Sequence, residues 1–140
     1  MAGSSIASEA ASKQEARRRL APVADAVALV LFVTVGLFSH HGGVSLTGYA
    51  RDALPLLACW FAAAAFFGLY RRPTRRAFLL TWVVGVTAGI LVRQLVVWSF
   101  HADDLVFLVV ALTFTLLFVL GGRVLLAVTP PARPARRASA

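Results

Sequence analysis

Residues 105–128 read LVFLVVALTFTLLFVLGGRVLLAV, a block in which Arg123 is the only charged side chain. Blocks of 18 or more apolar residues are typical of helices that span a bilayer, whose hydrocarbon core is about 30 Å thick. Apolar blocks of similar length occur at residues 22–39, 53–70 and 77–99. The sequence therefore predicts an all-α membrane protein, a bundle of four transmembrane helices.

The composition of the whole chain supports this class. Of its 140 residues, 59% are hydrophobic and only 14% are charged, whereas soluble domains carry roughly 25% charged residues. This excess of apolar surface must face a solvent other than water. Lipid is the solvent that accepts it.

The segments outside the apolar blocks define the predicted domain organisation. Residues 1–21 are rich in Ala and Ser, and residues 129–140 are basic and contain three prolines. We predict a flexible cytoplasmic N-terminal tail over 1–21, a transmembrane domain over 22–128 and a basic Pro-rich cytoplasmic tail over 129–140. A frayed or surface-lying helix is the alternative for the N-terminal tail. Asp52 is expected to cap the second helix, with Pro55 in its first turn.

Basic residues are distributed unequally between the two ends of the predicted helices. The N-terminal tail, the turn at residues 71–76 and the C-terminal end each carry four Lys or Arg, while the two other loops carry only Arg51. Because cytoplasmic loops carry the excess of Lys and Arg, we predict a multi-pass protein of the cell membrane with both termini inside the cell. The basic segments are expected to contact anionic lipid headgroups.

The charge and the motif content exclude several function classes. The formal net charge is +8, but no basic face carries interleaved aromatic residues, so we expect no nucleic-acid partner. Cys59 is the single cysteine, which excludes an internal disulfide and a Cys-x-x-Cys redox pair. No catalytic motif occurs, and we expect a protein that is not an enzyme, with no catalytic residue, cofactor or metal.

Arg93 is the most informative polar position because it lies within the third apolar block. Steps of four residues toward the N-terminus reach Gly89, Gly85 and Thr81, so Arg93 shares a helix face with small residues that favour close helix packing. An arginine at this depth needs a partner. Two interpretations remain open: a pathway for an anion or a proton, and a structural clamp. The candidate clamp partners are Asp52, Asp103 and Asp104.

Asp25 lies one turn into the first helix from the cytoplasmic side. A carboxylate there is stabilised by the positive end of the helix dipole. It is also expected to meet an arginine of the same membrane face, either Arg71, Arg72 or Arg123. A proton-coupled exporter would place its carboxylate nearer the midplane of the bilayer.

Histidine and aspartate side chains gather in the outer loops. Imidazole and carboxylate groups are zinc ligands, but the spacing of these residues matches no metal motif, and we expect no metal site. The residues are His40, His41, His101, Asp103 and Asp104.

The four blocks resemble the domain of unknown function family 3054, a family of small membrane proteins, over residues 22–128. The resemblance is carried by features in the order in which the family has them: Asp25 in the first helix, Gly36-Leu37-Phe38-Ser39-His40 at its outer end, Pro55, Trp82 with Gly89 and Arg93, and Leu120-Gly121-Gly122-Arg123. The chain departs from the family pattern at Leu37, where the family has arginine, and at Gly122, where it has tryptophan. The resemblance implies a four-helix membrane protein and supplies no activity.

We predict a small non-enzymatic structural or accessory membrane subunit that works through a membrane protein partner or as a homo-oligomer. The alternative is a small oligomeric transporter or channel for an ion or anion, with Arg93 as the intramembrane charge and His40 or Asp25 as a relay. The candidate functional or helix-packing positions are Arg93, Asp25, His40, Gly85 and Gly89.

Overall fold

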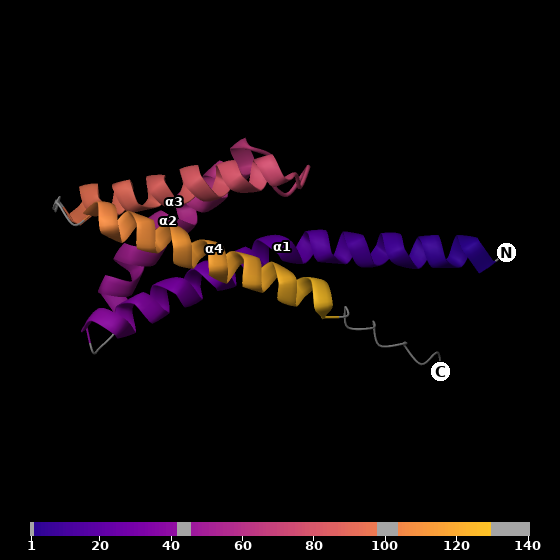
Figure 1. Ribbon diagram of the computed structural model, residues 1–140, viewed down its shortest axis with the longest axis horizontal. Helices are drawn as coiled ribbons and strands as arrows, with labels where there is room; N and C mark the ends of the chain where they lie inside the picture. Colours follow the sequence, from indigo (N-terminus) through magenta and orange to yellow (C-terminus); the bar gives the residue numbers. More distant parts are fainter. Residues whose placement is uncertain (1, 42–45, 98–103, 130–140) are drawn as a thin grey trace.

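A computed structural model of the chain describes residues 2–41, 46–97 and 104–129. These residues form four helices: α1 (Ala2–His41), α2 (Leu46–Phe66), α3 (Arg75–Val97) and α4 (Asp104–Val128). Figure 1 shows the helices packed side by side over part of their length, with the N-terminal part of α1 extending away from the other three. The described part of the chain is therefore all-α.

The helices pack as two close pairs. The most extensive contact joins α2 to α3, the next joins α1 to α4, and smaller contacts join α1 to α2 and α3 to α4. Each helix thus has two neighbours, with α1 diagonal to α3 and α2 diagonal to α4. A residue that reaches the centre of the bundle from one helix meets side chains of the other three.

Three helices are long and apolar enough to cross a membrane. Their candidate spans are Ala10–Phe38, Arg75–Val97 and Leu105–Val128. Less than a third of each span is buried, so most large apolar side chains face outward, as they do in a helix surrounded by lipid. The helix α2 is not among these three, because Arg51 and Asp52 lie within it and lower its mean hydropathy.

The core between the helices holds few large side chains. Trp60, Leu29, Val86 and Val119 are fully buried. Small residues fill much of the rest, including alanines of α1, α2 and α4. Close helix packing through small residues is the usual arrangement in membranes, where burial of apolar surface does not drive helices together.

The start of α1 differs from the predicted flexible tail over residues 1–21. The helix begins at Ala2 and continues through Pro22 to His41, a length of about 60 Å at 1.5 Å per residue. Ala, Glu, Lys, Gln and Arg favour helix, and they dominate the second half of this segment. An ion pair between Arg19 and Glu15, at 2.7 Å, adds an i to i+4 contact.

The bounds of α2 also differ from the predicted range 53–70. The helix begins at Leu46, so Asp52 lies inside it and does not cap it. Tyr49 packs against the core, and its hydroxyl lies 3.5 Å from the carbonyl oxygen of Val30. These contacts support about two helical turns before the predicted start at residue 53.

Gly68 ends α2 earlier than predicted. Its φ of 68° is left-handed, a conformation that glycine adopts without strain. The amide of Leu69 donates to the carbonyl of Ala64 at 2.9 Å, and the amide of Gly68 donates to Ala65 at 3.3 Å. This pair of hydrogen bonds is the Schellman motif, which reverses the chain after a helix.

The next two helices begin close to their predicted starts. Thr74 caps α3, because its Oγ1 accepts a hydrogen bond of 3.1 Å from the amide of Ala77. The helix α3 begins two residues before predicted position 77, and α4 begins one residue before predicted position 105. The predicted end of the third helix, at residue 99, lies outside the described residues.

Candidate functional site

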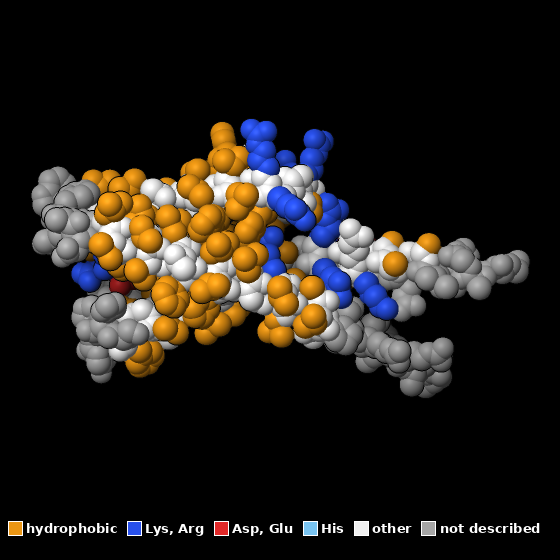
Figure 2. Space-filling model, in the orientation of Figure 1, with side chains coloured by type: hydrophobic (Ala, Val, Ile, Leu, Met, Phe, Trp, Pro, Cys, Tyr) orange, Lys and Arg blue, Asp and Glu red, His pale blue; other side chains and the backbone are white. Residues whose placement is uncertain are grey.

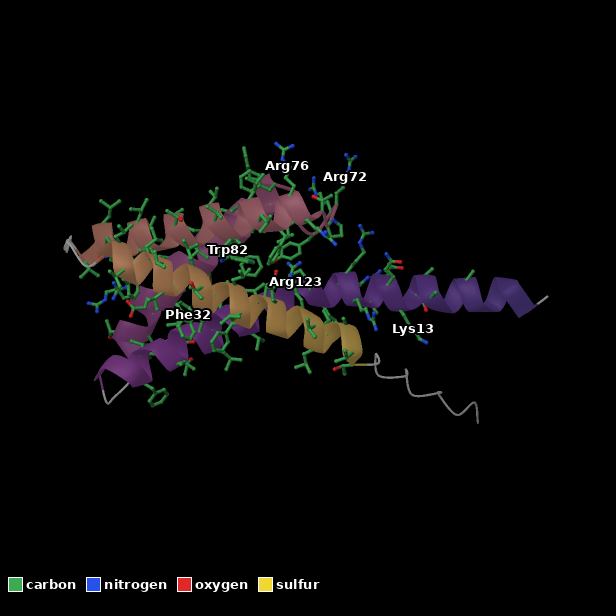
Figure 3. All side chains as sticks on the ribbon, viewed as in Figure 1. Lys13, Phe32, Arg72, Arg76, Trp82 and Arg123 are labelled. Atoms are coloured by element: carbon green, nitrogen blue, oxygen red, sulfur yellow. The ribbon has the colours of Figure 1, made fainter. Side chains whose placement is uncertain are left out.

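A buried ion pair joins α1 to α4. The Asp25 side chain is fully buried, and Arg123 donates to it from Nε to Oδ1 at 2.9 Å and from Nη2 to Oδ2 at 2.6 Å. Two parallel hydrogen bonds between a guanidinium and a carboxylate form the strongest ion-pair geometry in proteins. Figure 3 shows Arg123 pointing from α4 into the bundle, whereas Arg72 and Arg76 point outward.

This ion pair is extended by three aromatic residues. The hydroxyl of Tyr70, in the turn after α2, donates to Asp25 Oδ2 at 2.8 Å, and Trp60 Nε1 donates to the Tyr70 oxygen at 3.2 Å. The guanidinium carbon of Arg123 lies 4.8 Å from the centre of the Phe78 ring on α3. Together these five residues link all four helices, and we call them the inner clamp.

The surroundings of the inner clamp compensate its two charges. Burying an ion pair is costly unless its remaining polar atoms are hydrogen-bonded, and Tyr70 supplies a further donor to the carboxylate. Burial raises the pKa of the Tyr70 hydroxyl, and the negative charge of Asp25 raises it further. Tyr70 therefore stays protonated at neutral pH and donates its hydrogen to Asp25.

A second ion pair lies at the opposite end of the bundle. Arg93 Nε on α3 donates to Asp52 Oδ1 on α2 at 2.7 Å, and both side chains are mostly buried. The guanidinium carbon of Arg93 also lies 5.6 Å from the centre of the Phe107 ring on α4. We call these three residues the outer clamp. Arg51 lies 3.9 Å from the same Asp52 oxygen but is more exposed.

Asp52 is one of the three partners expected for Arg93. The other two expected partners cannot be placed beside it, since Asp103 and the side chain of Asp104 lie outside the described residues. For Asp25, the partner among the three expected arginines is Arg123.

A cavity of about 160 Å³ adjoins the outer clamp. All four helices contribute to its wall, which is apolar except for Asp52 and Arg93. The other lining residues are Phe32, Val33, Gly36, Leu37, Leu56, Val86, Gly89, Ile90, Phe107, Val110 and Ala111. The bundle thus has a partly open apolar cavity with an ion pair in its wall.

Gly85 and Gly89 lie where α3 comes closest to α2. A Cβ atom at Gly89 would lie 2.9 Å from the Cα of Leu56, and one at Gly85 would lie 3.1 Å from the Cα of Trp60. Both glycines are buried, one and two turns from Arg93 along the same face of the helix. They let the two backbones approach closely enough for Asp52 to reach Arg93.

Exposed arginines gather at the end of the bundle that holds the inner clamp (Figure 2). Two of them also bind backbone carbonyls of other segments: Arg17 Nη2 donates to Ala127 at 2.5 Å, and Arg18 Nη2 donates to Arg71 at 3.0 Å. These contacts fix the N-terminal part of α1 to the end of α4 and to the turn between α2 and α3. We call this end the basic end.

Several predicted positions fall outside the described structure. The side chains of His40 and His41 are not described, and neither are His101 and Asp103. Among the residues that the structure describes, no group of three or more His, Cys, Asp or Glu side chains is placed to hold a metal ion.

Three aromatic residues of the clamps were not singled out as partners in the sequence. Phe78 and Phe107 lie against the arginines, and Tyr70 is at the end of the second apolar block, a position typical of the headgroup boundary. The available signal for Tyr70 was Gly68, whose turn directs the residue back toward the bundle. Phe78 and Phe107 carry no local signal, because their roles depend on how α3 and α4 face each other.

Comparisons with known proteins give one match. A family model described as "Protein of unknown function (DUF3054)" matches residues 22–126, which is 105 of the 140 residues. The match includes both clamps and the cavity. A search of curated proteins and a search of solved structures each found no match. Of the two departures from the family pattern noted above, Leu37 lines the cavity beside Arg93. A Cβ atom at Gly122 would lie 3.6 Å from the carbonyl oxygen of Ala24 and 3.7 Å from the Cβ of Ala28.

Proposed function

The chain belongs to the DUF3054 family, whose description assigns no function, and we propose that it is a small non-enzymatic structural or accessory subunit of the cell membrane. In this proposal all four helices cross the bilayer, both termini are cytoplasmic, and the protein acts through a membrane protein partner or as a homo-oligomer. The arrangement of charges inside the bundle supports the proposal.

The length and the contacts of α2 support its assignment as a fourth span. Its 21 residues correspond to about 32 Å of helix, which matches a hydrocarbon core of about 30 Å. It packs against α3 over the most extensive helix contact of the bundle. Its two charged residues adjoin each other near one end, and Asp52 is paired with Arg93. Pairing reduces the cost of placing these charges near the membrane.

The basic end supports the proposed orientation. Exposed arginines of α1, of the turn between α2 and α3 and of the first turn of α3 lie together at this end: Arg17, Arg18, Arg19, Arg71, Arg72, Arg75 and Arg76. At the other end the described basic residues are Arg51 and Arg93, both beside Asp52. A basic end in the cytoplasm follows the rule for membrane topology and faces the anionic lipids of the inner leaflet.

The observation that carries the functional proposal is that both arginines inside the bundle are held by aspartates of neighbouring helices. Arg123 binds Asp25, and Arg93 binds Asp52. A charge that is used to bind a passing ion must exchange partners, whereas these charges are fixed by two different helices and an aromatic ring each. The ion pairs hold the helices together in a rigid bundle. The outward apolar faces of the helices can then contact lipid and partner helices.

One observation favours a second candidate function. The cavity that Arg93 lines is partly open and lies at the outer end of the bundle, where an anion or ion could enter a small oligomeric transporter or channel. In that candidate, Arg93 would release Asp52 during each cycle. The two functions therefore differ in whether the ion pair opens.

Replacement of Arg93 by lysine distinguishes the two candidate functions. Arg93→Lys keeps the charge but loses the planar guanidinium. For an accessory subunit we expect co-purification of the partner, or of the oligomer, in mild detergent with wild type and with Arg93→Lys alike. For a transporter we expect ion flux in proteoliposomes of wild type and a large loss of flux in the variant. Flux by the purified wild-type protein would overturn the accessory proposal.

A further inference from the structure

We propose that the cavity beside the outer clamp is a binding site for a small uncharged ring compound that carries a hydroxyl group, of the phenol type. The ring would occupy the apolar space, and the hydroxyl would face the Arg93–Asp52 pair. This inference goes beyond the proposed function, because a subunit of either kind could hold such a ligand.

The volume of the cavity fits one ring. Its roughly 160 Å³ is close to that of an engineered apolar cavity of roughly 150 Å³ in another protein, which stays free of water and binds benzene. Side chains of Phe32, Val86, Ile90 and Val110 supply apolar contacts from three helices. The cavity is partly open, and its volume has room for a six-membered ring.

The ion pair determines which polar group the ligand should carry. Arg93 brings a donor and Asp52 brings an acceptor to the same part of the wall. A hydroxyl both donates and accepts, so it matches this pair without adding net charge. A charged ligand would have to break the pair, because the rest of the wall offers apolar contacts only.

Two glycines provide a matched pair of variants. Gly36 lines the cavity, and a Cβ at this position would meet no atom within 4 Å. Gly36→Leu should therefore fill part of the cavity without displacing the backbone. Gly121 is also helical and also has nothing within 4 Å of a Cβ, but it does not line this cavity. Gly121→Leu adds the same side chain elsewhere on the bundle.

The test measures binding by fluorine NMR with the purified full-length protein in detergent. The probes are 4-fluorophenol and fluorobenzene, which differ by the hydroxyl alone. We expect saturable broadening of the 4-fluorophenol signal with wild type and with Gly121→Leu, and its loss with Gly36→Leu. Fluorobenzene should bind roughly two- to tenfold more weakly, the factor that corresponds to one net hydrogen bond.

Three outcomes would overturn the proposal. Equal broadening with both glycine variants would mean that the probe partitions into the micelle. Equal affinity for the two probes would mean that the ion pair does not take part in binding. A phospholipid that native mass spectrometry finds bound to wild type and not to Gly36→Leu, and that 4-fluorophenol fails to displace, would mean that an acyl chain occupies the cavity.

Discussion

Arg123 and Asp25 are separated by 98 positions in the chain and form two parallel hydrogen bonds of 2.9 and 2.6 Å inside the bundle. This contact fixes α4 against α1, and Tyr70 and Phe78 join the other two helices to it. The outer clamp repeats the arrangement at the other end with different helices. The inner clamp and the outer clamp, at opposite ends of the bundle, restrict both sliding and splaying of the helices.

Removal of Asp25 should strongly destabilise the protein. Asp25→Ala leaves Arg123 buried without a counter-charge, and breaking one partner of a buried pair costs about 3–5 kcal/mol. The measurement is the free energy of unfolding in mixed detergent micelles. As a control, Glu15→Ala removes the partner of exposed Arg19 and should cause no measurable loss.

A double replacement tests whether the loss of stability in Asp25→Ala comes from the unpaired charge of Arg123. Asp25→Leu combined with Arg123→Met removes both charges and should recover most of the stability, since an apolar pair of similar volume replaces a buried ion pair without the desolvation cost. Equal stability of Asp25→Ala and Glu15→Ala would contradict the role assigned to the inner clamp.

Gly89 should resist substitution more than any exposed glycine of the helices. Gly89→Ala places a Cβ 2.9 Å from the Cα of Leu56, so α2 and α3 must separate, at a cost of about 1–3 kcal/mol. Gly121→Ala meets no atom within 4 Å and should be neutral or stabilising by up to about 1 kcal/mol, because alanine favours helix. Thermal unfolding of the two variants in one detergent compares them. Equal melting temperatures would exclude close packing at Gly89.

The sequence predicted those features of the site that follow from the period of a single helix. Steps of four residues placed Gly85, Gly89 and Arg93 on one face, and the structure has all three on the side of α3 that packs against α2. The partner of Arg93 could not be chosen among three aspartates. That choice depends on the start of α2 at Leu46, which packing of Tyr49 on the core supports.

The position of Tyr70 was not predictable from the hydrophobic pattern. An aromatic residue at the end of an apolar block is typical of the membrane interface. The left-handed turn at Gly68 changes its direction, so that Leu69 is buried and Tyr70 reaches Asp25. A glycine within an alanine-rich block does not by itself reveal whether it continues the helix or ends it.

Tyr70→Phe tests how much the hydrogen bonds of the Tyr70 hydroxyl contribute to stability. The variant removes a donor to Asp25 and leaves Trp60 Nε1 without its acceptor, which should cost about 2 kcal/mol of unfolding free energy. Tyr49→Phe is the matched control, because its hydroxyl makes only a 3.5 Å contact, and it should change stability little. A result in which the two variants lose the same stability would remove Tyr70 from the inner clamp.

The proposed topology is tested by labelling introduced cysteines. In a Cys59→Ser background, Thr47→Cys lies at the start of α2, and Arg72→Cys lies in the exposed turn between α2 and α3. On intact cells a membrane-impermeant maleimide should label Thr47→Cys alone, and after permeabilisation it should label both. Labelling of both on intact cells would show that α2 does not cross the membrane, and labelling of Arg72→Cys alone would reverse the orientation.

The central claim is that the arginines inside the bundle hold the helices together through ion pairs. A double-mutant cycle between Arg93 and Asp52 tests this claim most directly. The unfolding free energies of wild type, Arg93→Ala, Asp52→Ala and the double variant give the coupling energy of the pair. We predict a favourable coupling of about 1–3 kcal/mol, with each single variant less stable than wild type. A coupling near zero, with single variants as stable as wild type, would contradict the claim and assign Arg93 to a binding or transport role.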